Sequence, residues 1–232
     1  MRVTEQPAFI LHRRDFRDSS LILDVFTLDH GRLSVLARGA RKRRDRSVFQ
    51  PFNRLSLSWT GGSELKTVTA LDAVGIPLDP DCYLAAYYVN ELLLYLLPPQ
   101  DPCEPVFHAY QRLLLGISPD SLEQNLREFE LVLLGELGLM PDLGRLAHDD
   151  SPVAAQGFYR VEPGAGVVPS RADDGQALTG ELLLRIGRGA WSDPDVRRAA
   201  RRLMRQIIDF NLQGRTLQSR RLYQQMYASR QQ

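Results

Sequence analysis

The side chains that could catalyse a reaction are few in this sequence. It holds four histidines and two cysteines, and one tight group of acid–base or metal-binding types, His148-Asp149-Asp150, with Asp142 close by. Adjacent side chains seldom converge on one metal ion, and this segment shows no helix or strand pattern that could hold carboxylates around a cation. The sequence also lacks the GxxxxGK[ST] and GxGxxG loops of nucleotide-binding proteins and the GxSxG motif of serine hydrolases. It therefore argues against an enzyme, and it predicts no metal ion and no other cofactor.

Clustered basic residues are the feature that points to a ligand. Between residues 38 and 46, six of nine positions are basic: Arg38, Arg41, Lys42, Arg43, Arg44 and Arg46. An arginine keeps its charge near neutral pH and can donate two hydrogen bonds to one phosphate group. The run therefore predicts a loop that binds nucleic-acid phosphates, and a solvated surface loop is the alternative.

Two aromatic residues lie beside basic residues in segments expected to be loops. Phe16 and Phe49 are predicted to stack on bases, as aromatic side chains do in proteins that bind single strands. Their basic neighbours, also assigned to the nucleic-acid site, are Arg13, Arg14, Arg17 and Arg46. By contrast, Phe9, Phe26 and Trp59 belong to apolar strands and are expected in a barrel core.

Charge is segregated along the chain, although the net charge is only +1. Residues 1–80 hold 13 Lys and Arg against 9 Asp and Glu, residues 81–190 hold 7 against 16, and residues 191–232 hold 9 against 3. Opposed blocks of charge predict separate surfaces with separate partners. In the last block, Arg197, Arg201 and Arg205 follow one helix and are predicted to supply a second nucleic-acid contact, with a solvated helix face as the alternative.

The elements that must position these residues change in character near residue 80. Alternating apolar residues predict five short strands in residues 9–14, 21–26, 31–37, 55–59 and 64–71. Such a series favours a five-stranded OB-fold barrel. Helical spacing then predicts five helices: residues 83–97, residues 105–115, a helix through residues 126–137 that ends at Gly138, a helix with Pro194 in its first turn, and residues 217–227. An irregular insertion at 139–178 is expected to contain a hairpin. We therefore expect an α+β fold with an OB-fold domain in residues 1–80 and a mainly α-helical domain in residues 81–232.

Length and composition set the broad class. The 232 residues are 44% hydrophobic and 25% charged, which is typical of a globular protein with a substantial core. No stretch approaches the roughly 18 to 20 apolar residues of a membrane span, and no signal peptide is evident. Cys82 and Cys103 form no CxxC motif. A cytoplasmic protein, associated with the nucleoid, is expected.

Motifs along nearly the whole chain resemble those of one family, the bacterial recombination mediator RecO. The resemblance rests on short matches that occur in the family's order: residues 8–12, 19–27, 31–33, 37–41, 50–52, 66–67, 88–93, 129–138 and 217–220, the last being Leu217-Gln218-Ser219-Arg220. Each match alone is weak, and together they are specific. One departure is clear, because many members carry a four-cysteine zinc module where this chain has residues 139–148 and no cysteine.

The resemblance implies a function in DNA repair and homologous recombination. Members bind single- and double-stranded DNA, anneal complementary strands, act on DNA coated with single-stranded-DNA-binding protein (SSB), and work with the partner RecR to load recombinase. It also implies that the helical domain binds the acidic, apolar-ended SSB tail, for which an apolar groove flanked by cations is needed. The candidates are Arg112, Leu114, Arg127 and Leu131, although these leucines could instead be core.

Two other functions are compatible with the residues alone. An RNA-binding OB protein of translation or RNA processing would use the same barrel and basic loop, since nothing in the sequence distinguishes recognition of the 2′-hydroxyl. A metal-dependent nuclease using Asp142, His148, Asp149 and Asp150 is a weaker alternative.

Overall fold

The structure is a computed structural model that describes residues 2–229. The chain forms two compact units. The barrel unit comprises the residues up to Pro119 together with those from Leu217 onward, and the insert unit comprises Asp120–Thr216. This division by compactness differs from the expected domain boundary at residue 80, because two helices that follow the barrel pack against it; the boundary stays a prediction.

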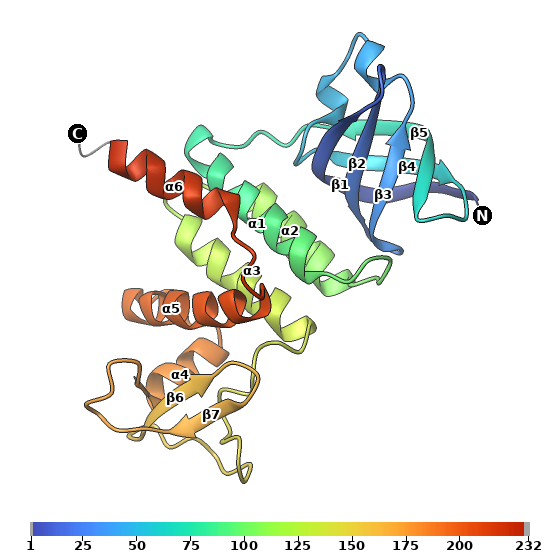
Figure 1. Cartoon of the computed structure of the whole chain (residues 1–232). Helices are drawn as coiled ribbons and strands as arrows, with labels where there is room; N and C mark the ends of the chain where they lie inside the picture. Colours follow the sequence, from blue (N-terminus) through green and yellow to red (C-terminus); the bar gives the residue numbers. More distant parts are fainter. Residues whose placement is uncertain (1, 230–232) are drawn as a thin grey trace. The chain divides into compact units, whose positions relative to one another are not determined.

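A closed five-stranded barrel forms the first part of the barrel unit (Figure 1). Its strands, in chain order, are β1 (Arg2–Phe16), β2 (Ser20–Thr27), β3 (Gly31–Ala37), β4 (Arg54–Thr60) and β5 (Leu65–Val74). They are connected in the order β1-β2-β3-β5-β4, with β3 and β5 parallel and the other pairs antiparallel. The predicted OB-type barrel and the α+β class are thus confirmed, with a first strand much longer than residues 9–14.

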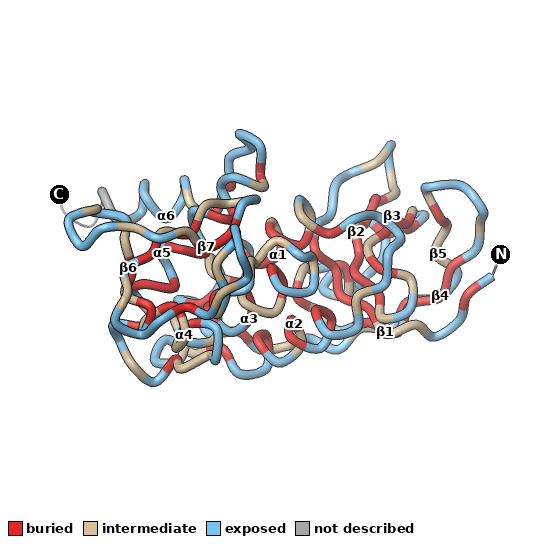
Figure 2. The backbone as a smooth tube through the Cα atoms, turned by 90° about the horizontal axis from the view of Figure 1, so that it is seen from below, coloured by how far each residue is buried: buried red, intermediate tan, exposed pale blue. Residues whose placement is uncertain are grey.

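The alternation of apolar residues along the strands fills the barrel. Figure 2 shows buried and exposed stretches alternating along these strands. The buried cluster includes Ile10, Leu23, Val25, Val35, Leu57 and Trp59. Trp59 therefore lies in the core as the sequence predicted.

A β-bulge at Leu11 changes which residues of β1 face the barrel interior. Before the bulge, the even-numbered Ala8 and Ile10 point into the barrel. The pairing register with β2 shifts between Ile10 and His12, so after the bulge the even-numbered residues point outward. Residues His12, Arg14 and Phe16 consequently share the outer face with Asp24 and Ile22 of β2. Bulges often re-aim side chains in this way.

Two helices cover the outer face of β1 and β2 below the bulge. They are α1 (Tyr83–Leu96), which follows the short 3₁₀ helix η3 (Pro80–Cys82), and α2 (Glu104–Gly116). The ring of Phe9 lies 5.3 Å from that of Phe107 and 5.1 Å from that of Tyr110, centroid to centroid, and Phe26 lies 5.4 Å from Phe107. Phe9 and Phe26 are buried, but outside the barrel; their expected place in its core is wrong because α2 supplies a second apolar layer.

The α1–α2 connection is fastened to the start of β3. Both Nε and Nη2 of Arg32 donate to the carbonyl of Leu97, at 3.2 and 3.0 Å, and the Gln100 amide donates to the carbonyl of Arg32 at 2.8 Å. Gly31 lies so close to this connection that a Cβ atom would stand 2.2 Å from the carbonyl oxygen of Asp101. The helices and the barrel are therefore one packed body at this point.

The last helix, α6 (Gln218–Ser229), returns to the barrel unit and packs on α1. The Glu91 carboxylate accepts hydrogen bonds from the amides of Gln218 (2.8 Å) and Ser219 (2.9 Å) and from the Ser219 hydroxyl. Leu217 and Ser219 are buried at this junction. One carboxylate of α1 thus satisfies free amides at the N-terminus of α6.

The insert unit combines three helices with a small three-stranded sheet of order β7-β6-β8. Its elements are α3 (Leu122–Glu136), β6 (Phe158–Glu162), β7 (Gly166–Pro169), β8 (Leu178–Thr179), α4 (Gly180–Gly187) and α5 (Pro194–Asn211). The predicted hairpin and the Pro194 helix are confirmed, and Asp193 accepts from the Asp195 amide as its N-cap. The helix α4 was not predicted from the sequence.

None of the helices within residues 2–229 is both long enough and apolar enough to cross a membrane.

Candidate nucleic-acid interface

The basic loop, residues 38–46, emerges between β3 and β4. It contains the 3₁₀ helix η1 (Ala40–Lys42) and leads into a second, η2 (Ser47–Phe49). Ala40 is 1% exposed and anchors the loop in the barrel, whereas every basic residue of the loop is exposed: Arg38, Arg41, Lys42, Arg43, Arg44 and Arg46. The loop therefore presents a concentrated positive charge to solvent, as the sequence predicted.

Arg41 joins this loop to the β1–β2 turn. Its amide donates to the carbonyl of Ser19 at 2.9 Å, its Nη1 donates to the carbonyl of Arg17 at 3.1 Å, and its Nη2 lies 3.3 Å from the carboxylate of Asp15. The two loops are consequently held side by side. Arg41 therefore forms an ion pair with Asp15, whereas Arg43 and Arg44 form none with the residues that the structure describes.

One carboxylate lies within the basic loop. Oδ1 of Asp45 accepts from the Ser47 amide at 2.9 Å and from the Ser47 hydroxyl at 2.5 Å. These hydrogen bonds, together with the nearby Arg43, lower the pKa of Asp45 below its ordinary value. Asp45 is therefore charged near neutral pH and shapes the loop's exit into η2.

Phe49 is not available to stack on a base. It is 2% exposed and belongs to the barrel core, where η2 places it, so its expected stacking role is wrong. The guanidinium of Arg43 lies 5.6 Å from its ring centroid and helps to cover it. The physical reason is that η2 turns this apolar side chain into the buried cluster of the barrel instead of leaving it on the basic loop.

Phe16 does lie at the surface. It is the last residue of β1, is half-buried, and has the guanidinium of Arg17 at 5.2 Å from its ring centroid. Arg13, Arg14 and Arg17 are all exposed. The bulge separates two of them, because Arg14 shares the outer face with Phe16 whereas Arg13, paired with Leu23, has the opposite parity.

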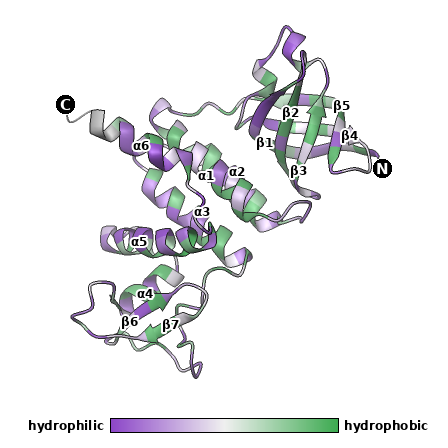
Figure 3. Ribbon diagram, viewed as in Figure 1, coloured by the Kyte–Doolittle hydropathy of each residue, from purple (hydrophilic) through white to green (hydrophobic). Residues whose placement is uncertain are grey.

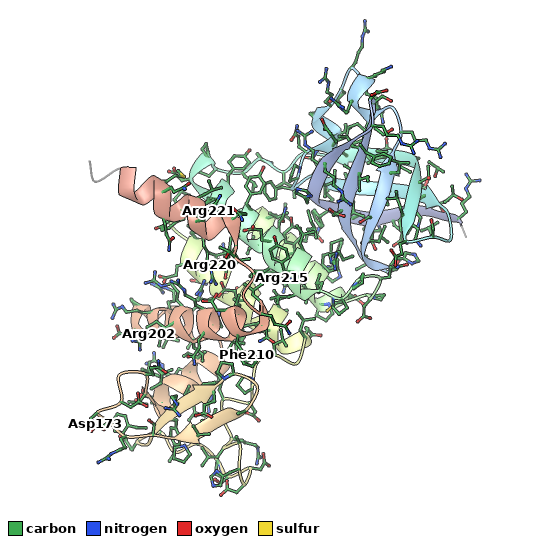
Figure 4. The ribbon with its side chains drawn as sticks, in the orientation of Figure 1. Asp173, Arg202, Phe210, Arg215, Arg220 and Arg221 are labelled. Atoms are coloured by element: carbon green, nitrogen blue, oxygen red, sulfur yellow. The ribbon has the colours of Figure 1, made fainter. Side chains whose placement is uncertain are left out.

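The arginines of α5 form a second exposed basic surface, in the insert unit. Figure 3 shows how hydrophilic this helix is along one side. Arg201 lies 3.9 Å from Glu123, Arg205 lies 3.6 Å from Asp209, and Arg202, labelled in Figure 4, has no carboxylate partner within the part of the chain that the structure describes. Arg197 differs: it is half-buried, donates to the carbonyl of Trp191 and lies 3.5 Å from Glu123 on α3. Its hydrogen bond and ion pair use part of its guanidinium for packing, and its expected DNA contact stays a prediction.

The residues expected to bind the SSB tail do not form one exposed site. Leu114 is 1% exposed and lies in the core. Arg127 is 5% exposed and donates to Glu130 at 2.8 Å in a buried ion pair. Only Arg112 is exposed, and Leu131 is half-buried. The expected roles of Leu114 and Arg127 are wrong because helical periodicity turns both side chains inward, whereas those of Arg112 and Leu131 stay predictions. Leu115 of α2 is exposed.

The residues of the nuclease alternative lie around an open pocket of about 380 Å³ in the insert unit. There His148 Nε2 pairs with Asp149 at 3.1 Å, Arg145 pairs with Asp150 at 3.0 Å, and Asp142 accepts from the Gly144 amide at 2.8 Å. Across residues 2–229, no three His, Cys, Asp or Glu side chains are grouped so that they could hold a metal ion. These carboxylates shape turns.

Comparison with known proteins identifies the family. Residues 1–77 match the description Recombination protein O N terminal, and residues 77–221 match Recombination protein O C terminal. The chain belongs to the RecO family of DNA repair proteins. It is 39% identical to the DNA repair protein RecO of Methylococcus capsulatus over 227 residues, which cover 96% of this chain and 93% of that protein. It is 36% identical to that of Marinobacter nauticus (95% and 94%) and 37% identical to that of Polynucleobacter necessarius (96% of each).

Membership of the RecO family assigns the chain to DNA repair and recombination. It favours DNA over the RNA alternative that the residues alone left open. The resemblance stated from scattered motifs is thus confirmed over residues 1–221.

Proposed function

We propose that this RecO-family chain binds single- and double-stranded DNA and anneals complementary strands, including strands coated with SSB, as a mediator that helps RecR to load recombinase. The observation that supports this best is the basic loop: six exposed basic residues beside the β1–β2 turn of a closed barrel. No step in this function requires a nucleophile, a metal ion or a nucleotide.

Annealing is limited by the repulsion between two phosphate backbones. A protein that neutralises both strands at once lowers this repulsion and releases condensed counterions, so its affinity falls steeply as the salt concentration rises. The basic loop would hold one strand through Lys42, Arg43 and Arg44. The exposed arginines of α5, Arg201, Arg202 and Arg205, would provide a second cationic surface.

The test is annealing of two complementary DNA strands that have been coated with SSB, at low and moderate salt, without nucleotide or metal. We expect the chain to accelerate annealing and the Arg43→Glu/Arg44→Glu variant to lose most of the acceleration. The matched control is Arg2→Glu/Arg54→Glu, which makes the same charge change at exposed arginines outside the loop. Equal loss in both variants would mean that net charge, and not the loop, is responsible.

Two further outcomes decide between partners. Tighter binding to RNA than to DNA of the same sequence would overturn the proposal in favour of an RNA-binding protein. Acceleration on SSB-coated strands that disappears when the SSB lacks its acidic tail, while acceleration on bare strands is kept, would support a direct contact with that tail, at a site other than the one assigned to Arg127 and Leu114.

A further inference from the structure

The outer face of β2 and β3, with the adjoining loops, is the face on which OB folds commonly bind oligonucleotides, and β1 pairs with β2 beside it. In this chain the pairing register divides it into rows of side chains that cross the three strands. The lowest row is the one packed against α2, and the upper rows lie toward the end of β1 at Phe16. In that order the rows are Phe9–Phe26–Arg32, His12–Asp24–Ser34, Arg14–Ile22–Leu36 and Phe16–Ser20.

The lowest row is closed to any ligand. Phe9 and Phe26 are fully buried against Phe107, and Arg32 is engaged with the carbonyl of Leu97. A strand of nucleic acid therefore has no access to this row.

The next row carries a fixed negative charge. The Asp24 carboxylate accepts from the Ser34 hydroxyl at 2.5 Å and lies 3.4 Å from Nδ1 of His12. Burial acts to raise the pKa of Asp24, but the hydrogen bonds from His12 and Ser34 and the charge of Arg14 outweigh it and lower the pKa. A carboxylate in this position repels a phosphate backbone.

The two upper rows have the opposite character. Arg14 is exposed, Ile22 in the same row is buried, Leu36 is half-buried, and Phe16 offers a half-buried ring with Arg17 close to it. Arg38 follows directly after the last residue of β3 and is exposed. Apolar side chains framed by arginines fit the base and phosphate of a single strand.

We propose that single-stranded DNA crosses only the upper part of this face, with a base on Phe16 and phosphates on Arg14, Arg17 and Arg38, and that Asp24 marks the limit of the site. This rests on the proposed function and specifies where on the barrel the strand lies. The rows of Arg14 and Phe16 are two residues apart along β1, or about 7 Å at about 3.3 Å per residue, so this part of the face contacts few nucleotides, at or below the lower end of the range of about 4–16 for OB folds.

The experiment measures the affinity of the full chain for fluorescent oligothymidylates of increasing length. We expect Arg14→Glu to weaken binding about tenfold at low salt and to reduce the salt slope, and Phe16→Ala to weaken it about fivefold to a hundredfold with the salt slope unchanged. Arg2→Glu is the matched control, because Arg2 is an exposed arginine at the opposite end of the same strand. Asp24→Asn keeps a hydrogen-bonding side chain and is expected to tighten binding and to lengthen the shortest oligonucleotide that binds fully.

The results separate this inference from the proposed function. If Arg43→Glu/Arg44→Glu weakens binding while Arg14→Glu and Phe16→Ala do not, the loop binds DNA and the assignment of the face is overturned. If Asp24→Asn shortens or weakens the contact, Asp24 is not its limit. If the wild-type chain fails to bind any oligonucleotide, both proposals fail. Unchanged circular dichroism and thermal unfolding are required of each variant.

Discussion

The side-chain amide of Asn90 on α1 donates a 2.8 Å hydrogen bond to the carbonyl oxygen of Leu11, the residue at the bulge of β1. Asn90 is itself fixed by the hydroxyl of Tyr110 on α2, which donates to its Oδ1 at 2.5 Å. Burial raises the pKa of Tyr110 far above its ordinary value, so this donor stays protonated. The bulge that turns Arg14 and Phe16 outward is therefore held by both helices.

Replacing Asn90 tests this relationship. We expect Asn90→Ala to lower the free energy of unfolding in urea by about 1–3 kcal/mol, because the buried carbonyl of Leu11 loses its donor. The matched control is Asn53→Ala, which removes a 2.7 Å bond from the Asn53 amide to the carbonyl of Ser47 at an exposed site and is expected to cost less. DNA affinity should fall with Asn90→Ala, and fall less when Phe16 is already alanine; equal losses in both backgrounds would show that the bulge does not position that ring.

Substitution of Gly31 and of Gly39 separates the cost of a left-handed backbone conformation from the cost of a steric clash. Both have positive φ, 64° and 66°, but an added Cβ meets Asp101 at Gly31 and open space at Gly39. Gly39→Ala should cost about 1–2 kcal/mol of unfolding free energy for the left-handed conformation. Gly31→Ala should cost about 1–3 kcal/mol more, because the connection between α1 and α2 must move. Similar thermal shifts for both variants would contradict the close packing of this connection against β3.

The buried pair of Arg127 and Glu130 predicts an asymmetric response to mutation. Arg127→Met leaves the carboxylate of Glu130, 1% exposed, without its cation, and should lower the unfolding free energy by about 3–5 kcal/mol. Arg127→Met/Glu130→Leu should recover most of that loss, since apolar side chains of similar volume replace both charges. A double variant as unstable as the single one would show that further partners of the pair are responsible.

The pH dependence of stability tests the environment of Asp24. Its pKa in the folded chain lies below the ordinary value of 3.8, despite the opposing effect of burial. The folded state therefore gains stability from the ionised carboxylate above about pH 4, and this gain is lost as the pH falls through the lowered pKa. We expect the unfolding midpoint of wild type to fall over this acid range by more than that of Asp24→Asn. Asp72→Asn, at an exposed position on β5, should behave as wild type.

Local patterns were sufficient for the strands and most helices. Alternation in β2, β3 and β4, and the Pro194 start of α5, are written in consecutive residues, so they could be predicted. The α4 helix was missed because its short apolar run lies between glycines, without the length that usually marks a helix.

The errors in the candidate site came from contacts between distant residues. Nothing local shows that Phe49 fills the barrel or that Phe9 meets Phe107 from a later helix. The bulge at Leu11 was equally hidden, and with it the outward direction of Arg14 and Phe16. The error at Arg127 differs, because it could have been avoided from the sequence: Arg127 and Glu130 are three residues apart on a helix, a spacing that allows an ion pair.

The position of α6 in the barrel unit affects the order in which the two units can fold during synthesis. Residues from Leu217 onward belong to the same compact unit as the barrel, whereas Asp120–Thr216 form a unit of their own. During translation the insert unit can complete its packing first, while the N-terminus of α6 is still absent and Glu91 has no amide donors from Gln218 and Ser219. The part of the chain that is synthesised first therefore waits for a helix that is synthesised about a hundred residues later.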